Sequence, residues 1–162
     1  MKSLRIACTL TLVLCTYTGL SLAEEVTPGR QLAEDIFGSI EDNPNGMVDI
    51  GEFVNFGRLI FESMDHDESG FIDFPEFTEW DFGFNFIAED SGQKQAYEAA
   101  QKILFAVWDR DGDGKLRRQE YHKAMVWDFT RADANDDAFL TRDEFLHGYL
   151  VNVAYRAAIT GL

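Results

Sequence analysis

The stretch that decides the fold covers residues 109–120 and reads Asp-Arg-Asp-Gly-Asp-Gly-Lys-Leu-Arg-Arg-Gln-Glu. Aspartates stand at its first, third and fifth positions, a glycine follows at the sixth, where the chain must turn sharply, and a glutamate closes it at the twelfth. Ca²⁺ is a hard cation that prefers about six to eight oxygen ligands, and this spacing directs carboxylates and one backbone carbonyl toward a single point. The stretch therefore predicts a calcium site with the ligands Asp109, Asp111, Asp113, the carbonyl of Lys115 and Glu120.

A second stretch, residues 65–76, repeats this pattern closely, with Gly70 at the sixth position. It carries four acids, whose mutual repulsion a bound cation would relieve. Its predicted ligands are Asp65, Asp67, Ser69, the carbonyl of Phe71, Asp73 and Glu76.

A third stretch, residues 133–144, follows the pattern except that Ala138 replaces the glycine. The sixth position usually needs a positive φ, which costs an alanine about 1 kcal/mol, so this site is expected to be strained or slightly weaker. Its predicted ligands are Asp133, Asn135, Asp137, the carbonyl of Phe139, Thr141 and Glu144.

A fourth stretch, residues 41–52, departs further from the pattern, because its first ligand is a glutamate and Pro44 stiffens the turn. Whether calcium occupies it is left open, and for every loop the alternative is an acidic turn on a solvated surface. Its candidate ligands are Glu41, Asn43, Asn45, the carbonyl of Met47, Asp49 and Glu52.

All four stretches carry an aliphatic residue at the eighth position, namely Val48, Ile72, Leu116 and Leu140. From about Pro28 to about Ala158 the chain thus resembles the EF-hand calcium-binding superfamily, in which this residue faces the core and forms a short β-bridge with a partner loop. The resemblance implies an all-α fold, a helix-loop-helix array with short β-bridges between paired loops.

The spacing of the loops predicts how they pair. Numbered in chain order, the four loops start at residues 41, 65, 109 and 133, so the starts of the first two loops, and of the last two, are only 24 positions apart. One helix of about 15 residues must then leave one loop and lead into the next, which separates those loops by roughly 22 Å. We therefore expect the second loop to pair with the third and the first with the fourth, unless a kink at Gly57 splits the first shared helix.

Amphipathic helices are expected between the loops. Apolar residues at helical spacing predict a helix that begins near Pro28 and one that leads through Tyr97 into the third loop. The second loop is expected to be followed by a helical segment from Phe77 to Glu89, and the fourth by one last helix carrying Phe145, Tyr149 and Val153.

Residues 1–23 have the pattern of a secretory signal peptide, with a basic start, an apolar run too short to span a bilayer, and small residues before Glu24. A membrane anchor is the alternative. Both cysteines of the chain lie in this segment, so the expected mature domain, residues 24–162, forms no disulfide.

The expected mature domain is strongly acidic. Residues 1–23 hold two of the 14 basic residues and none of the 29 acidic ones, which leaves the mature domain a net charge of −17. Such a charge argues against binding nucleic acid or anionic lipid.

The expected function is that of a secreted, extracellular calcium-binding protein that acts as a buffer, store or structural module. The alternative is a calcium-dependent binder of a protein or mineral partner, either a sensor-like adaptor or a biomineral matrix protein, since the chain also looks like the acidic EF-hand proteins of calcified tissues. The aromatic segment 80–86 is the candidate partner site, although burial in the core is the simpler interpretation. An enzyme is not expected, because the three histidines are scattered and the expected mature domain has no cysteine nucleophile, Gly-rich phosphate loop or zinc-type spacing.

Overall fold

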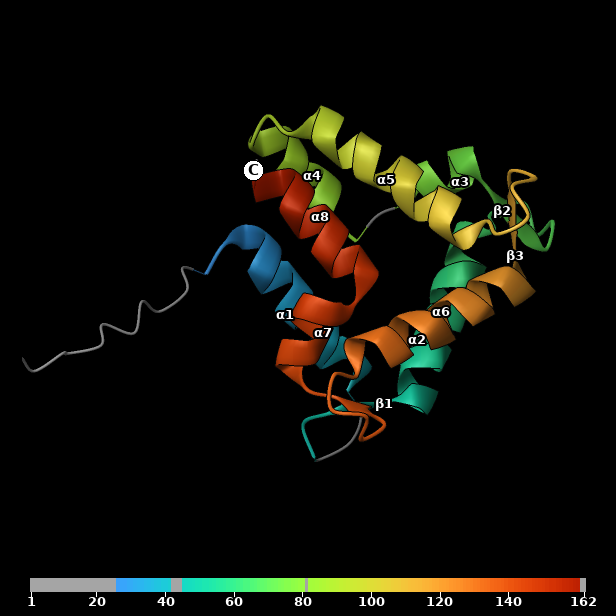
Figure 1. The fold of residues 1–162 in the computed structure, drawn as a ribbon. Helices are drawn as coiled ribbons and strands as arrows, with labels where there is room; N and C mark the ends of the chain where they lie inside the picture. Colours follow the sequence, from blue (N-terminus) through green and yellow to red (C-terminus); the bar gives the residue numbers. More distant parts are fainter. Residues whose placement is uncertain (1–25, 42–44, 81, 161–162) are drawn as a thin grey trace, which may run out of the picture.

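The computed structural model describes residues 26–41, 45–80 and 82–160, and it is an array of helices joined by acidic loops (Figure 1). The expected signal peptide and the candidate ligand Asn43 lie outside the described residues. The helices are α1 (Pro28–Ile40), α2 (Ile50–Met64), α3 (Phe74–Glu79), α4 (Phe84–Asp90), α5 (Lys94–Trp108), α6 (Arg118–Ala132), α7 (Arg142–Gly148) and α8 (Leu150–Thr160). The strands are β1 (Val48–Asp49), β2 (Phe71–Asp73), β3 (Lys115–Arg117) and β4 (Phe139–Leu140). None of the described helices is long and apolar enough to cross a bilayer.

Helices α2 and α6 each connect two loops without interruption, and each is 15 residues long. The kink considered at Gly57 is not present. Gly57 instead marks the place where α2 packs against α6, since a Cβ atom there would lie 2.7 Å from Cγ of Met125. A side chain at this position would displace Met125 from its place in the core, so the glycine makes room for this methionine between the two helices.

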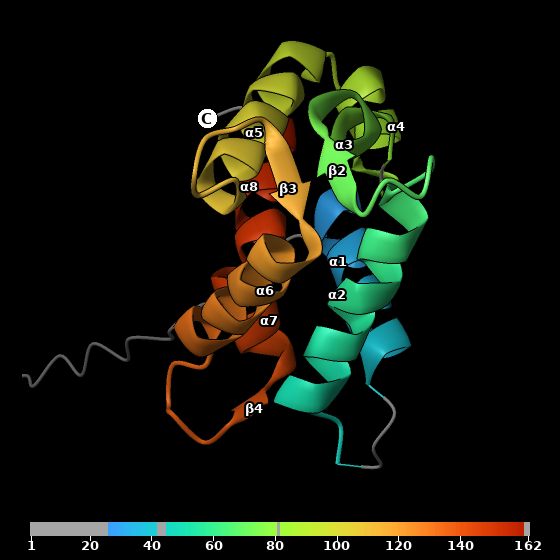
Figure 2. The ribbon, with the colours of Figure 1, turned by 90° about the vertical axis from the view of Figure 1, so that its right-hand side faces the viewer.

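The loops pair as the spacing predicted. Strand β2 pairs with β3 in antiparallel register, with Ile72 opposite Leu116, and β1 pairs with β4, with Val48 opposite Leu140. All four of these eighth-position residues are 0% exposed. The two small sheets lie at opposite ends of α2 and α6, as Figure 2 shows, so each of these helices links one sheet to the other.

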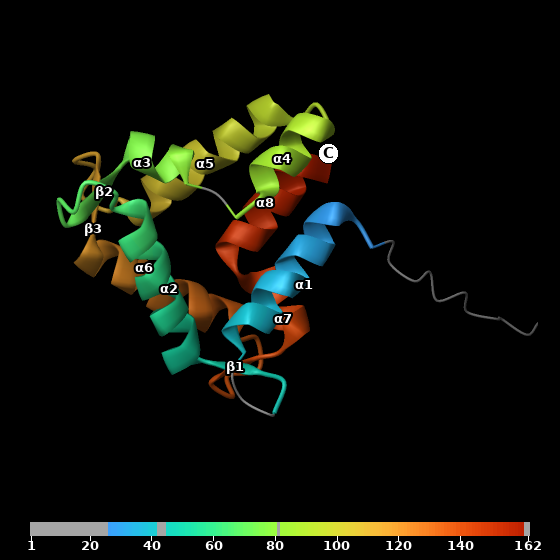
Figure 3. The same ribbon diagram turned by 180° about the vertical axis from the view of Figure 1, so that it is seen from behind.

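The helices that leave the second and fourth loops are broken, which corrects the expectation of one continuous segment in each place. Trp80 has an extended backbone, with φ −84° and ψ 138°, and Gly83 has φ 99°, so α3 ends and α4 begins in a new direction. Tyr149, with φ −66° and ψ 122°, separates α7 from α8 in the same way. These turns bring α4 and α8 together beside α1, as the view from behind shows (Figure 3).

Aromatic side chains fill the core that these turns create. The ring of Phe53 lies 5.0 Å from that of Tyr149 and 5.7 Å from that of Phe129, and Tyr155 contacts Phe84 and Tyr97 at 5.5 and 4.7 Å between centroids. The two Phe53 pairs are edge-on and the two Tyr155 pairs are tilted, and aromatic pairs in such geometries contribute beyond the area that they bury.

The aromatic segment 80–86 mostly belongs to this core. Phe84 is fully buried, and the ring of Phe82 lies 4.2 Å from Trp80 and 5.9 Å from Phe56. Phe86 alone among its described aromatic residues is largely exposed, at 66%. The simpler interpretation of this segment, burial, therefore holds for most of its rings.

One carboxylate, Asp128 on α6, is buried in this aromatic surrounding and is 3% exposed. Burial raises its pKa to about 6, although Arg131, whose Nη2 lies 3.0 Å from Oδ1, lowers it in part. The indole nitrogen of Trp108 lies beside the carboxylate but outside hydrogen-bonding geometry. The charged form of Asp128 is thus disfavoured in the folded protein.

We predict that the pH dependence of stability changes in the variant Asp128→Asn. The folded pKa of about 6 lies above the ordinary value of 3.8, so the stability that Asp128 contributes is complete below the lower value and is lost as pH rises through the higher one. In saturating calcium, the unfolding free energy of the variant relative to the parent should increase between pH 5 and pH 7.5 by on the order of 1 kcal/mol. Urea unfolding measures it. The exposed Asp35→Asn serves as control, and an equal pH dependence in both variants would contradict the prediction.

Candidate metal centres

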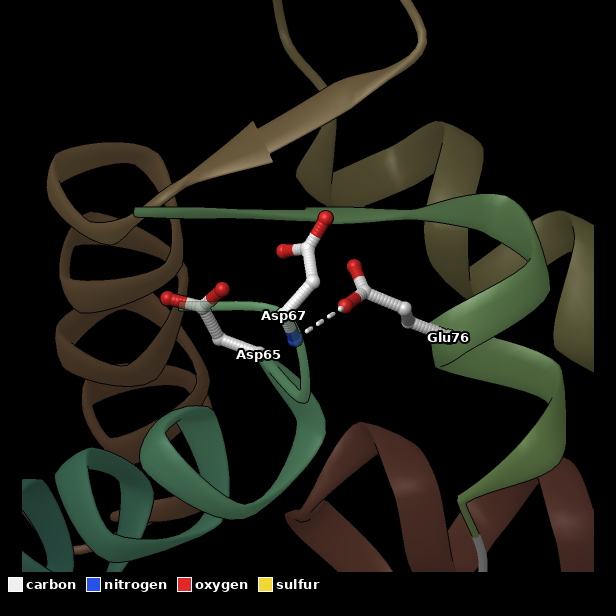
Figure 4. A group of neighbouring side chains, drawn as sticks. All are labelled: Asp65, Asp67 and Glu76. Atoms are coloured by element: carbon white, nitrogen blue, oxygen red, sulfur yellow. Dashed lines mark hydrogen bonds between the residues drawn. The ribbon is translucent and has the colours of Figure 1, made fainter. Parts of the chain in front are cut away.

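The second loop brings three of its predicted ligands together. Asp65, Asp67 and Glu76 each place a carboxylate oxygen within 4.8 Å of the other two, and Figure 4 shows the three side chains facing one space between β2 and the ends of α2 and α3. Asp65 is 8% exposed. Like charges are held this close only where hydrogen bonds or a cation compensate them.

Backbone amides supply part of that compensation. Oδ2 of Asp65 accepts from the N–H of Gly70 at 3.0 Å, and Oδ1 of Asp67 accepts from the N–H of Ser69 at 2.9 Å. Oε1 of Glu76 accepts from the N–H of His66 at 3.0 Å. These bonds orient the carboxylates, and the other lone pairs of their oxygens remain available for a metal ion.

The third loop has the same geometry. Asp109, Asp111 and Glu120 form the second group of three carboxylates that the described residues contain within 4.8 Å of one another. Asp109 is 8% exposed and accepts from the N–H groups of Gly112 at 3.0 Å and Gly114 at 2.9 Å. The predicted fifth-position ligand, Asp113, accepts from the N–H of Lys115 at 2.9 Å.

A guanidinium group lies across the carboxylates of this third loop. Nη2 of Arg117 is 2.6 Å from Oδ2 of Asp113, and its Nη1 is 3.6 Å from Asp111 and 3.8 Å from Glu120. The hydrogen bond from Arg117 holds the pKa of the Asp113 carboxyl below its usual range. The ninth position therefore places a competing positive charge at the site.

The fourth loop also forms the expected turn. Ala138 has φ 67°, the positive value that its position demands, and its N–H donates to Oδ2 of Asp133 at 2.9 Å. Oδ1 of Asp137 accepts from the N–H of Phe139 at 2.9 Å. An alanine thus adopts a conformation that favours glycine, at a cost of about 1 kcal/mol.

The glutamate at the twelfth position connects each loop to the helix that follows it. Its side chain accepts from the backbone N–H of the ninth residue, at 2.8 to 3.1 Å, which closes the loop onto the first turn of the next helix. In three loops the ninth residue accepts in return from the glutamate N–H, which completes a capping box. In the fourth loop, burial raises the pKa of Glu144, but hydrogen bonds from Thr141 and Ala134 outweigh it and keep the pKa low.

The first loop is described only in part. Glu41 is the C-cap residue of α1, and Oδ1 of Asn45 accepts from the N–H of Met47 at 2.9 Å. Gly46 has φ 71°, and Asp49 with Glu52 forms the capping box that begins α2. This half of the loop matches the others, and whether calcium occupies the loop stays open.

The donor set fits calcium better than a softer metal. The described predicted ligands offer carboxylate, amide, hydroxyl and backbone carbonyl oxygens, and none offers nitrogen or sulfur. In the second and third loops the carboxylates already face one point. Calcium would be held there by the first, third, fifth and twelfth side chains, and it would neutralise their repulsion.

The sequence did not reveal that the fourth residue within three of the loops has a positive φ angle. Glu68 has φ 58° and Asp136 has φ 62°, and Gly112 stands at the same place with φ 70°. Gly112 in the third loop was the one residue whose type indicated a positive φ at this position.

Comparison with known proteins agrees with this geometry. The family model described as EF hand matches residues 58–79, which span the end of α2, the second loop and α3. The parvalbumin alpha proteins of Rattus norvegicus and Mus musculus are each 36% identical to the chain over 64 residues, which is 40% of this chain and 54% of each relative. The chain thus spans about half the length of the curated relatives that it matches.

We predict that Arg117→Gln strengthens calcium binding at the third loop. The change removes the guanidinium that lies 2.6 Å from Asp113 and leaves the loop carboxylates in place. Because Arg117 is about half exposed, solvent screens its charge, and the expected gain in affinity is about threefold. Calorimetric titration with calcium measures it, with the neighbouring Arg118→Gln as control. An unchanged or lower affinity would show that Arg117 does not compete with the cation.

We also predict that Ala138→Gly tightens the fourth loop. Glycine adopts the φ of 67° without steric cost. The free energy of unfolding of the calcium-loaded variant should therefore exceed that of the parent by about 0.5–1 kcal/mol. Thermal or urea unfolding tests this. Ala134→Gly, in the same loop but without a positive φ, should be neutral or destabilising, and a similar effect of both changes would remove the conformational explanation.

Proposed function

The chain is a member of the EF-hand calcium-binding superfamily, and on this basis we propose that it acts as a secreted calcium buffer, store or structural module. The observation that carries the proposal is the sharing of α2 and α6 between loops. Because α2 leaves the first loop and leads into the second, a rotation of α2 at one end would disturb the β-bridge at the other. Such an arrangement resists the change of helix angle by which sensor proteins expose a groove.

The packing of the core supports a static module. Gly57 and Met125 are in close contact at the crossing of the two shared helices, and the rings of Phe53, Phe129 and Tyr149 interlock beneath it. Opening the loops would expose these rings, at a cost of about 25 cal/mol for each Å² of apolar surface.

An extracellular location suits sites that stay filled. Calcium outside the cell is on the order of 1 mM, and extracellular modules bind it with a Kd of about 10⁻⁴ to 10⁻³ M. Sites of this affinity are filled most of the time. A permanently filled site adds its binding free energy to the stability of the fold. This role fits the expected mature domain, residues 24–162, which has no cysteine and therefore no disulfide to stabilise it.

The proposed static role predicts a small structural response to calcium. With spin labels attached to cysteines that replace the exposed residues Ile103 on α5 and Lys123 on α6, the mean distance between the labels should change little when calcium is added, while its distribution narrows. A shift on the order of 5 Å or more would indicate a sensor-like opening and would contradict the proposal. Labels at Lys102 and Gln95, both on α5, control for local effects.

The proposed secretion predicts a defined N-terminus. Expressed in a host with a secretory pathway, the chain should be released into the medium and begin at Glu24, because residues 21–23 have the pattern of a cleavage site. Mass spectrometry of the released protein measures this. A chain that stays inside the cell with Met1 or its neighbours intact would contradict the proposed location and leave the calcium sites unaffected.

A further inference from the structure

Helices α2 and α6 line a cavity of about 650 Å³ that is open to solvent beside their crossing. Its walls are mostly apolar and include Val54 and Phe61 from α2 and Tyr121 and Met125 from α6. Pockets that bind small organic molecules have this size and this kind of lining. The cavity is bordered by Gly51 of the first loop and by Arg118 and Gln119 of the third, but no described loop carboxylate lines it.

The cavity is a fixed part of the fold. Three of its wall residues, Phe61, Tyr121 and Met125, are at most 3% exposed and belong to the core. The contact between Gly57 and Met125 already holds α2 and α6 at their closest approach. The space beside the crossing therefore cannot be closed by moving the two helices together.

Positive charge gathers at this cavity, in a chain whose net charge is −15. Arg58 and Arg118 line it from opposite helices, and the guanidinium of Arg118 also lies 4.7 Å above the ring of Phe61. Both arginines contact one carboxylate, that of Glu62, at 2.8 and 3.3 Å. Two guanidinium groups thus share a single acid, and one positive charge is left without an acidic partner in this cluster.

Glu62 is ionised and occupies only part of the hydrogen-bonding capacity of the two arginines. The hydrogen bond from Arg58 and the weaker one from Arg118 hold the pKa of the Glu62 carboxyl below its usual range. Glu62 is therefore ionised at neutral pH and occupies one side of the two guanidinium groups. Arg58 also donates from Nε and Nη2 to Oδ1 of Asn55, at 3.3 and 3.0 Å. A guanidinium group carries five N–H donors, so each arginine still has N–H groups for a second anion.

We propose that this cavity binds a small anionic amphiphile, an organic carboxylate, sulfate or sulfonate with an apolar body. The apolar body lies against Phe61, Tyr121 and Met125, and the anionic group faces Arg58 and Arg118. An inorganic anion would leave the apolar walls uncovered, and a cation would meet the excess positive charge. The proposed ligand is a free molecule and not a membrane surface.

The test compares two dyes that share one ring system. Anilinonaphthalene sulfonate carries an anionic group, and phenylnaphthylamine is the same body without it. We expect the calcium-loaded protein to bind one sulfonate dye per chain in the cavity, more tightly than the neutral dye. Inorganic phosphate should not displace it. Equal affinity for the two dyes, or displacement by phosphate alone, would overturn the proposed ligand class.

Two matched double variants locate the site. Arg58→Gln with Arg118→Gln should weaken binding of the sulfonate dye about tenfold, the loss expected from removing a charge-assisted contact, and should leave binding of the neutral dye nearly unchanged. Arg110→Gln with Lys123→Gln makes the same change in net charge. Arg110 lines a different cavity, of about 410 Å³, beside the exposed Trp127. An equal loss in both double variants, or a loss only in the second, would overturn the assignment.

A third variant is expected to bind the sulfonate dye more tightly. Because partly unfolded proteins also bind such dyes, the gain counts only if the variant unfolds as the parent does and still binds one dye per chain. Glu62→Gln removes the shared acid, so both guanidinium groups should face the ligand fully and the affinity for the sulfonate dye should rise about fivefold. No rise would contradict the role of the arginine pair.

Two further outcomes would overturn the choice of a free ligand. If the protein sediments with vesicles that contain an anionic phospholipid, the cavity binds a membrane. If the protein forms a dimer that the dye dissociates, the cavity binds a second copy of the chain.

Discussion

Two helices, α2 and α6, each belong to two loops at once, and the rest of the structure depends on that constraint. A rigid helix of 15 residues separates the loops at its two ends by roughly 22 Å, so neighbouring loops in the sequence cannot bridge each other. The second loop therefore pairs with the third and the first with the fourth. The two sheets and the crossing of α2 with α6 then hold the two pairs of loops within one fold.

The glutamate at the twelfth position connects this architecture to calcium. Its side chain accepts from the ninth-position N–H in every loop, and in the second and third loops it also lies within 4.8 Å of the first two aspartates. One side chain thus begins the next helix and completes the oxygen cluster. A cation at the cluster would reinforce the helix start, which couples metal binding to the stability of the fold.

Much of this arrangement could be predicted from the sequence, because it follows from local rules. The spacing of oxygen-bearing residues, the aliphatic eighth positions and the distances between loops were sufficient for the loops and their pairing. The positive φ of Ala138 followed from its place in the pattern. The comparisons and the fold agree with calcium binding, while the assignment of individual ligands stays a prediction.

Features that depend on contacts between distant residues could not be predicted in this way. The breaks at Trp80 to Gly83 and at Tyr149 arise because α4 and α8 must turn back over the core. The burial of Asp128, and the pairing of Arg58 and Arg118 around Glu62, require knowledge of which helices pack together. The sequence places an arginine, Arg117, at the ninth position of the third loop, but it does not show that the guanidinium lies across three carboxylates.

The most direct test of the account is a calcium titration followed by NMR in the parent protein and in Glu76→Gln. The amides of Gly70, Gly114 and Ala138 each donate to the first aspartate of their own loop, so each signal reports on one site. If the second and third loops form a unit through Ile72 and Leu116, the variant should lose binding at Gly70 and bind more weakly at Gly114, while Ala138 responds as in the parent. An undisturbed Gly114 response, or a loss at Ala138 instead, would contradict the central claim that the loops are coupled across the chain.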